Sequence, residues 1–238
     1  MTLSLIKTEQ RPSERRKLPR FPFCFLLFRP EGSKSALEVS DISQTGMQVQ
    51  SKSESMTYHR GQEIKGEMSW YGDSVEVKAA VAWVHGQRAG LKFLEIEQFK
   101  HQLEKFFDIS RVVEHLRPAH EQKMGFEIPN NLKIWLKTDG PVELFIWEHN
   151  DSEIQSFQVI LWDQYLEWED GKGLSTGRVI GRRNLETPLM QENVYDFEPD
   201  SESMNPRKRD RVFLLVEKIP EHLITQRVKE FLLRKLHS

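Results

Sequence analysis

Two short polar segments have the residue types and spacing to bind an anionic ligand. The first is a basic run, Arg15-Arg16-Lys17-Leu18-Pro19-Arg20, in which Arg16 and Arg20 form Arg-x-x-x-Arg immediately before an apolar stretch. The second is Asp41-Ile42-Ser43-Gln44-Thr45-Gly46, which reads Asp-x-Ser-x-x-Gly. Twenty residues separate the two segments, about enough for one β-hairpin, so both can lie at one rim of a β-barrel.

The chemistry of these residues favours a guanine nucleotide. Clustered guanidiniums provide bidentate donors for phosphate and flat surfaces that stack on purines. The Asp41 carboxylate can accept from the N–H edge of guanine or hold an arginine, and the Ser43 hydroxyl can bond base or phosphate. Gly46 allows a tight turn or the close approach of a ligand.

Each segment taken alone is ambiguous. A basic arm is most often a solvated arm. An Asp-x-Ser-x-x-Gly segment is most often a turn in which Asp or Ser bonds the neighbouring backbone. The order and spacing of the two segments together are much harder to obtain by chance.

The elements that would position these residues are short strands. Turn residues separate apolar runs in the first hundred residues, which predicts a small antiparallel barrel or sandwich. The predicted strands are Phe21–Phe28, Ser35–Ile42, Met47–Ser51, Glu63–Trp70, Ser74–His85 and Ala89–Ile96. Apolar residues at intervals of three and four then predict one helix over Glu97–Leu116, which Pro118 ends.

The rest of the chain predicts a linker and a second unit. Residues 117–126 are polar and predict the linker, and residues 127–238 predict an α+β domain. Residues 184–210 suggest a long loop. Pro220 suggests the first turn of a final helix. The predicted strands of this unit are Leu132–Lys137, Val142–Trp147, Phe157–Trp162, Tyr165–Trp168, Arg178–Ile180 and Arg211–Glu217.

The stretch Arg11–Ile96 resembles the PilZ domain, a bacterial receptor module for cyclic di-GMP built on a six-stranded antiparallel β-barrel. The likeness rests on the two polar segments in order and on a closing hairpin, Ala80–His85 with Gly90–Phe93. It implies a mainly β chain, with a ligand-binding arm over 1–20 and a PilZ domain with a flanking helix over 11–116.

The resemblance also implies roles for single residues. Arg16 and Arg20 would hold phosphate and stack on guanine, Asp41 and Ser43 would contact the base, and Gly46 would shape the turn. An arginine at the position of Arg15 is associated in the family with an intercalated ligand pair, so one or two ligands per site are both open.

The expected function is a non-enzymatic receptor in a reducing cytoplasm. Ligand phosphates would neutralise the arginines and fold the arm across the barrel, and residues 127–238 would signal to an unidentified downstream protein. One alternative is an adaptor that scaffolds a complex without binding nucleotide. Another is nucleic-acid binding by the arm and Arg207–Arg211, which predicts steep salt dependence.

Composition and missing motifs exclude several other classes. A formal net charge of −2 excludes a uniformly basic nucleic-acid binder, and the single cysteine, Cys24, excludes an internal disulfide and a multi-Cys metal site. No apolar run is long enough to span a bilayer. Gly171–Gly177 has the wrong order for a phosphate-binding P-loop, and no nucleophile–base signature is present, so we expect no metal, cofactor or catalytic residue.

Overall fold

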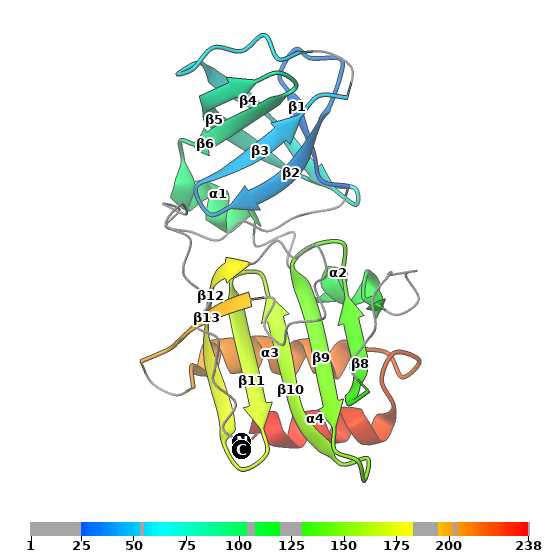
Figure 1. Cartoon of the computed structure of the whole chain (residues 1–238). Coiled ribbons are helices and arrows are strands. Elements are labelled where there is room, and N and C mark those ends of the chain that lie inside the picture. Colours follow the sequence, from blue (N-terminus) through cyan, green and yellow to red (C-terminus); the bar gives the residue numbers. More distant parts are fainter. Residues whose placement is uncertain are drawn as a thin grey trace, which may run out of the picture.

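The computed structural model describes residues 25–52, 55–103, 108–119, 130–182, 195–201 and 204–237. A closed β-barrel comes first along the chain, and an open β-sheet backed by helices follows it (Figure 1).

Six antiparallel strands form the barrel, in the order β1-β2-β3-β6-β5-β4. Side chains alternate along each strand, and those that point inward, such as Phe28, Val39 and Met68, are completely buried. The predicted barrel is therefore confirmed. Most boundaries differ from the sequence prediction by a few residues, and β4 matches it fully. The strands are β1 (Leu27–Pro30), β2 (Leu37–Ser43), β3 (Gly46–Gln50), β4 (Glu63–Trp70), β5 (Asp73–His85) and β6 (Arg88–Phe93).

Two helices occupy the region where the sequence predicted one. They are α1 (Ile96–Leu103) and α2 (Ile109–Glu114). The carboxylate of Asp108 accepts from the backbone N–H groups of Ser110 and Arg111, and a capping aspartate of this kind begins a new helix. The helical spacing of apolar residues spans both helices, but the N-cap gives α2 a start of its own.

Seven antiparallel strands form the open sheet, in the order β13-β12-β11-β10-β9-β8-β7. Arg117–Pro118, predicted to begin a linker, instead form the edge strand β7 and pair with Lys137 and Leu136. Proline is tolerated there because an edge strand does not need every N–H. The strands are β7 (Arg117–Pro118), β8 (Leu132–Lys137), β9 (Val142–Glu148), β10 (Ile154–Leu161), β11 (Gln164–Glu169), β12 (Gly173–Arg182) and β13 (Tyr195–Pro199).

Two long helices, α3 (Pro206–Lys218) and α4 (Gln226–His237), cover one face of the open sheet (Figure 1). The strand predicted over Arg211–Glu217 is wrong, because these residues lie inside α3. Val212, Leu215 and Val216 are its buried residues, and their spacing of three and four is helical rather than alternating. Part of the predicted loop 184–210 is likewise structured, as β13 and the first turn of α3.

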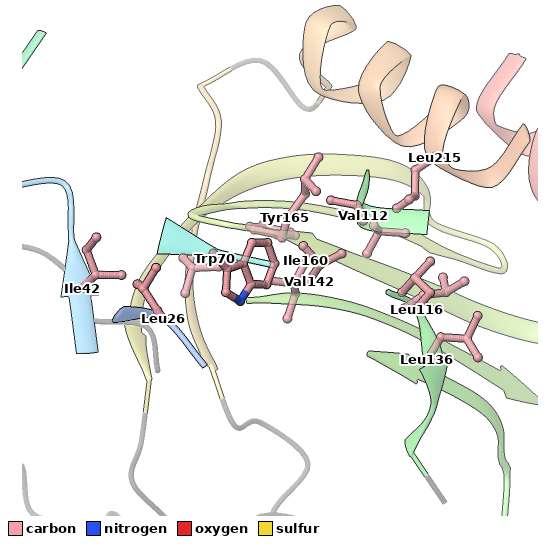
Figure 2. Close-up of a cluster of buried hydrophobic side chains, with 14 of the residues drawn as sticks. Leu26, Ile42, Trp70, Val112, Leu116, Leu136, Val142, Ile160, Tyr165 and Leu215 are labelled. Atoms are coloured by element: carbon pink, nitrogen blue, oxygen red, sulfur yellow. The ribbon is translucent and has the colours of Figure 1, made fainter. Parts of the chain in front are cut away.

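The barrel and the open sheet share one hydrophobic core. Trp70, at the end of β4, is 3% exposed and lies between barrel residues such as Ile42 and sheet residues such as Val142 and Ile160 (Figure 2). Helix α2 belongs to the second part of the structure, since it packs against α3. We use "C-terminal unit" below for the open sheet together with α2, α3 and α4.

Candidate functional site

The Asp-x-Ser-x-x-Gly segment forms the β2–β3 hairpin. Ser43 pairs with Gly46, which leaves Gln44 and Thr45 as the connecting loop. The Ser43 side chain is buried, and its hydroxyl donates to the Gly46 carbonyl (3.2 Å) and accepts from the Thr45 N–H (3.3 Å). The serine therefore closes the turn, and we call Ser43–Gly46 the motif loop.

Gly46 is needed for close packing within the barrel. A Cβ at this position would overlap the carbonyl oxygen of Leu91 on the neighbouring strand β6. Its φ is not in the left-handed region. The glycine therefore lets β3 approach β6, and this accounts for it independently of any ligand.

Asp41 is half-buried on β2, next to an irregularity in the pairing with β3 between Val39 and Asp41. The neighbouring residue Ile42 is completely buried in the core. The irregularity interrupts the alternation of side chains at this point, and the Oδ1 atom of the Asp41 carboxylate is shielded from solvent.

The three arginines of the predicted site, Arg15, Arg16 and Arg20, lie outside the described residues, as does Cys24. The chain that follows them can be traced from Phe25. The Val39 N–H donates to the Leu26 carbonyl (2.9 Å), and Leu27 pairs with Glu38. The N-terminal segment thus pairs with the part of β2 that immediately precedes Asp41.

The motif loop contacts the C-terminal unit directly. The side-chain amide of Gln44 donates to the carboxylate of Asp163 (2.5 Å), which follows β10 in the β10–β11 turn. The same carboxylate oxygen lies 3.5 Å from the guanidinium of Arg178 on β12. Gln44, Asp163 and Arg178 were not singled out by the sequence, because nothing in it indicates which turns of the two units meet.

A second set of contacts lies at the β4–β5 turn. The Tyr71 hydroxyl donates to Asp139, which also pairs with Arg117, and the Tyr71 ring stacks on His115 with centroids 3.8 Å apart. Burial raises the pKa of the Asp139 carboxyl above its ordinary value.

Arg111 of α2 pairs with Asp73 at 2.8 Å on the same side of the barrel. The contacts Gln44–Asp163, Tyr71–Asp139 and Asp73–Arg111 join the barrel to the C-terminal unit, and we call them the domain interface.

Residues 10–108 match the family model of the PilZ domain. The barrel is a PilZ domain. The family is one of cyclic di-GMP-binding receptors, and its domains are typically non-enzymatic ligand-binding domains. The C-terminal half of the chain has no family match. The PilZ assignment fits the six-stranded barrel and the hairpin position of the Asp-x-Ser-x-x-Gly segment.

The other comparisons add little. No curated protein matches the chain. A solved structure that matches is the crystal structure of an uncharacterized Legionella protein, at 15% identity and a TM-score of 0.29. The match covers 37% of this chain and 91% of that chain.

Three further observations concern other kinds of site. The part of the chain that the structure describes contains no group of three His, Cys, Asp or Glu side chains placed to hold a metal ion. Among the described helices, none has the length and apolar character to cross a bilayer. A cavity of about 450 Å³ lies between α4 and the β9–β10 turn, and it is lined by both cations and carboxylates around Trp168 and Phe231.

Proposed function

We propose that this chain is a cyclic di-GMP receptor that changes conformation when the ligand binds and signals to a protein partner through residues 127–238. The observation that carries the proposal is the position of the motif loop. It lies in the PilZ barrel beside the segment where the N-terminal arm joins, and it also touches the C-terminal unit.

The binding roles follow from donor and acceptor capacity. Arg16 and Arg20 hold the phosphates and stack on guanine, and Asp41 accepts from the guanine N–H edge. A hydroxyl can donate once and accept twice. Ser43 donates to Gly46 and accepts from Thr45, which leaves one acceptor position for the base. Arg15 serves a second, intercalated ligand.

The conformational change begins in the arm. Phosphate neutralises the mutual repulsion of the arginines, so the arm can pack across the barrel. The arm joins the barrel at Phe25, whose ring is 6.4 Å from that of Tyr71. Tyr71 is itself bonded to Asp139 of the C-terminal unit. Ordering of the arm therefore acts on residues of the domain interface.

Titration calorimetry of the full chain with cyclic di-GMP tests the proposal. We expect saturable binding to the wild type, at least a hundredfold weaker binding to Arg16→Ala/Arg20→Ala, and no binding of GTP. Each lost charged hydrogen bond costs about 1.5–3 kcal/mol, which for two arginines exceeds a hundredfold. Lys17→Ala is the matched control, because it removes a neighbouring charge of the arm that is outside the motif.

The stoichiometry and the negative result are both informative. A ratio near two ligands per chain supports the role of Arg15, and a ratio near one removes it. Absence of both heat and thermal shift at high ligand concentration contradicts the receptor proposal.

One observation favours a second candidate, an adaptor that binds no nucleotide. Ser43 and Gly46 both have roles inside the barrel, so two of the motif residues are explained by the hairpin alone. Nucleic-acid binding is less favoured than either. Lys208 and Arg209, in the basic run that would carry it, are already paired with Asp200 and Asp210. Neither candidate involves catalysis.

A further inference from the structure

We propose that the C-terminal unit contributes Arg178 to the cyclic di-GMP site of the barrel. This inference rests on the proposed function. It adds a phosphate-binding side chain that is distant in sequence from the arginine arm and lies outside the segment that matches the PilZ family.

Arg178 is joined to the motif loop through a single carboxylate. One oxygen of the Asp163 carboxylate accepts from the Gln44 amide at 2.5 Å and lies 3.5 Å from the Arg178 guanidinium. Gln44 is flanked by Ser43 and Thr45, so a single carboxylate joins the arginine to the centre of the motif loop. A ligand that extends from the motif loop along Gln44 would then meet the Arg178 side chain.

The backbone around Asp163 and Arg178 is held in place by the sheet. Arg178 lies on β12 opposite Gln164, the residue that follows Asp163. The Val179 N–H donates to the Asp163 carbonyl at 2.8 Å, which ties the β10–β11 turn to β12. The Asp163 side chain is only 12% exposed. The carboxylate is therefore a fixed anchor, whereas a long surface arginine would otherwise sample many rotamers.

Arg178 has N–H donors left for a ligand. Its side chain is 48% exposed, and its contact with Asp163 uses one terminal nitrogen at the long distance of 3.5 Å. A guanidinium has five N–H donors in a fixed fork that fits phosphate. Most of these donors can face a ligand without breaking the contact with Asp163.

Charge also favours this assignment. The Asp163 carboxylate lies against the motif loop and would repel a phosphate bound beside it. A cation that pairs with Asp163 offsets this repulsion locally, and its remaining N–H donors can bind the phosphate. Arg178 would supply this cation from the C-terminal unit.

The test is calorimetric titration of the full chain with cyclic di-GMP, using Arg178→Ala, Arg178→Lys and Arg111→Ala. Arg178→Ala is expected to weaken binding tenfold or more, because a charged hydrogen bond to the ligand is lost. Arg178→Lys keeps the charge without the fork and should restore part of the affinity. Arg111 is the matched control: it is also an interface arginine, 43% exposed, but pairs with Asp73. Arg111→Ala should stay within twofold of the wild type.

The outcomes separate this inference from the proposed function. The receptor function stands if the wild type binds and Arg16→Ala/Arg20→Ala does not. The role of Arg178 is overturned if, in the same experiment, Arg178→Ala binds within twofold of the wild type. Equal weakening by Arg178→Ala and Arg111→Ala also overturns it, because a general loosening of the domain interface then explains both. If the wild type fails to bind, the proposed function and the inference fall together.

Discussion

At the scale of single residues, the motif loop stabilises the barrel and also belongs to the proposed ligand site. Ser43 closes the hairpin with its hydroxyl, and Gly46 makes room for the backbone of β6. These roles are intramolecular, so they operate whether or not a ligand is present. Substitutions in the loop therefore need a stability measurement beside every binding measurement.

Gly46→Ala is expected to destabilise the barrel by about 2 kcal/mol or more, since the new methyl group must displace the backbone of β6. Urea unfolding followed by circular dichroism measures this. Thr45→Ala is the matched control, because its side chain is only half-buried and its structural bond, from the Phe93 N–H, uses the backbone carbonyl. It should change stability by about 0.5 kcal/mol or less. Full stability of Gly46→Ala would refute the packing role.

The sequence indicated the residues of the candidate site that lie in one hairpin, but not the contact of that hairpin with the C-terminal unit. Asp41, Ser43 and Gly46 are recognisable because their spacing within one hairpin is local. The Gln44–Asp163–Arg178 contact spans more than a hundred residues, and no local pattern encodes it. The ligand-binding roles assigned to Arg15, Arg16, Arg20, Asp41, Ser43 and Gly46 remain predictions.

At the scale of elements, the strands of the barrel were predictable because turn residues separate them. Helix α3 was not predictable. Its apolar run, Val212–Val216, is short enough to suit a strand or a helix, and the acidic and basic residues before it suggested a loop. Tertiary contacts fix α3 as a helix. Lys208 Nζ donates to the Gly177 carbonyl (2.7 Å) and to Asp200 (2.8 Å), which anchors the first turns on β12.

Lys208→Ala should cost about 2 kcal/mol of unfolding free energy, because it leaves the Gly177 carbonyl and the Asp200 carboxylate without their cation. Chemical denaturation at neutral pH measures the loss. Lys172→Ala is the control: its pair with Glu169 has side chains 73% and 38% exposed, so solvent screens the pair and no measurable change in stability is expected. Equal effects of the two substitutions would show that the contact on β12 contributes nothing specific.

The same contact predicts a pH dependence. Burial disfavours the charged form of Asp200, but the hydrogen bonds from Lys208 and Thr176 outweigh it and hold the pKa of its carboxyl below the ordinary value. A carboxyl with a lowered pKa in the folded state stabilises the fold above its unfolded pKa, and loses this as pH falls through the folded value. The stability difference between wild type and Lys208→Ala should therefore shrink below about pH 4. A difference that grows in acid would contradict the assignment.

At the scale of the whole molecule, the barrel and the C-terminal unit are joined by apolar as well as polar contacts. Trp70 is 3% exposed at the junction and also lies against His115, with ring centroids 6.2 Å apart. Nothing in the sequence distinguishes Trp70 from the other tryptophans, since its neighbours form an ordinary strand. The expectation of two units joined by a polar linker did not anticipate a shared core.

Trp70→Ala should uncouple the two units. Loss of a buried tryptophan costs about 3–5 kcal/mol, and here the loss falls on the junction. We expect scanning calorimetry to change from one thermal transition to two. Trp83→Ala is the control, because Trp83 is 36% exposed on the barrel wall and packs on Gly90. A single transition in Trp70→Ala would mean that the remaining contacts keep the units cooperative, which would contradict the role of Trp70.

The edges of the open sheet limit how this protein can meet other molecules. Both edge strands contain a proline, Pro118 in β7 and Pro199 in β13, and β7 is only two residues long. Proline has no backbone N–H, so each outer row of donors is interrupted. Strand addition from a second chain is therefore disfavoured at both edges. A molecule that binds the C-terminal unit is therefore expected to contact side chains rather than extend the sheet, and edge-to-edge aggregation is disfavoured.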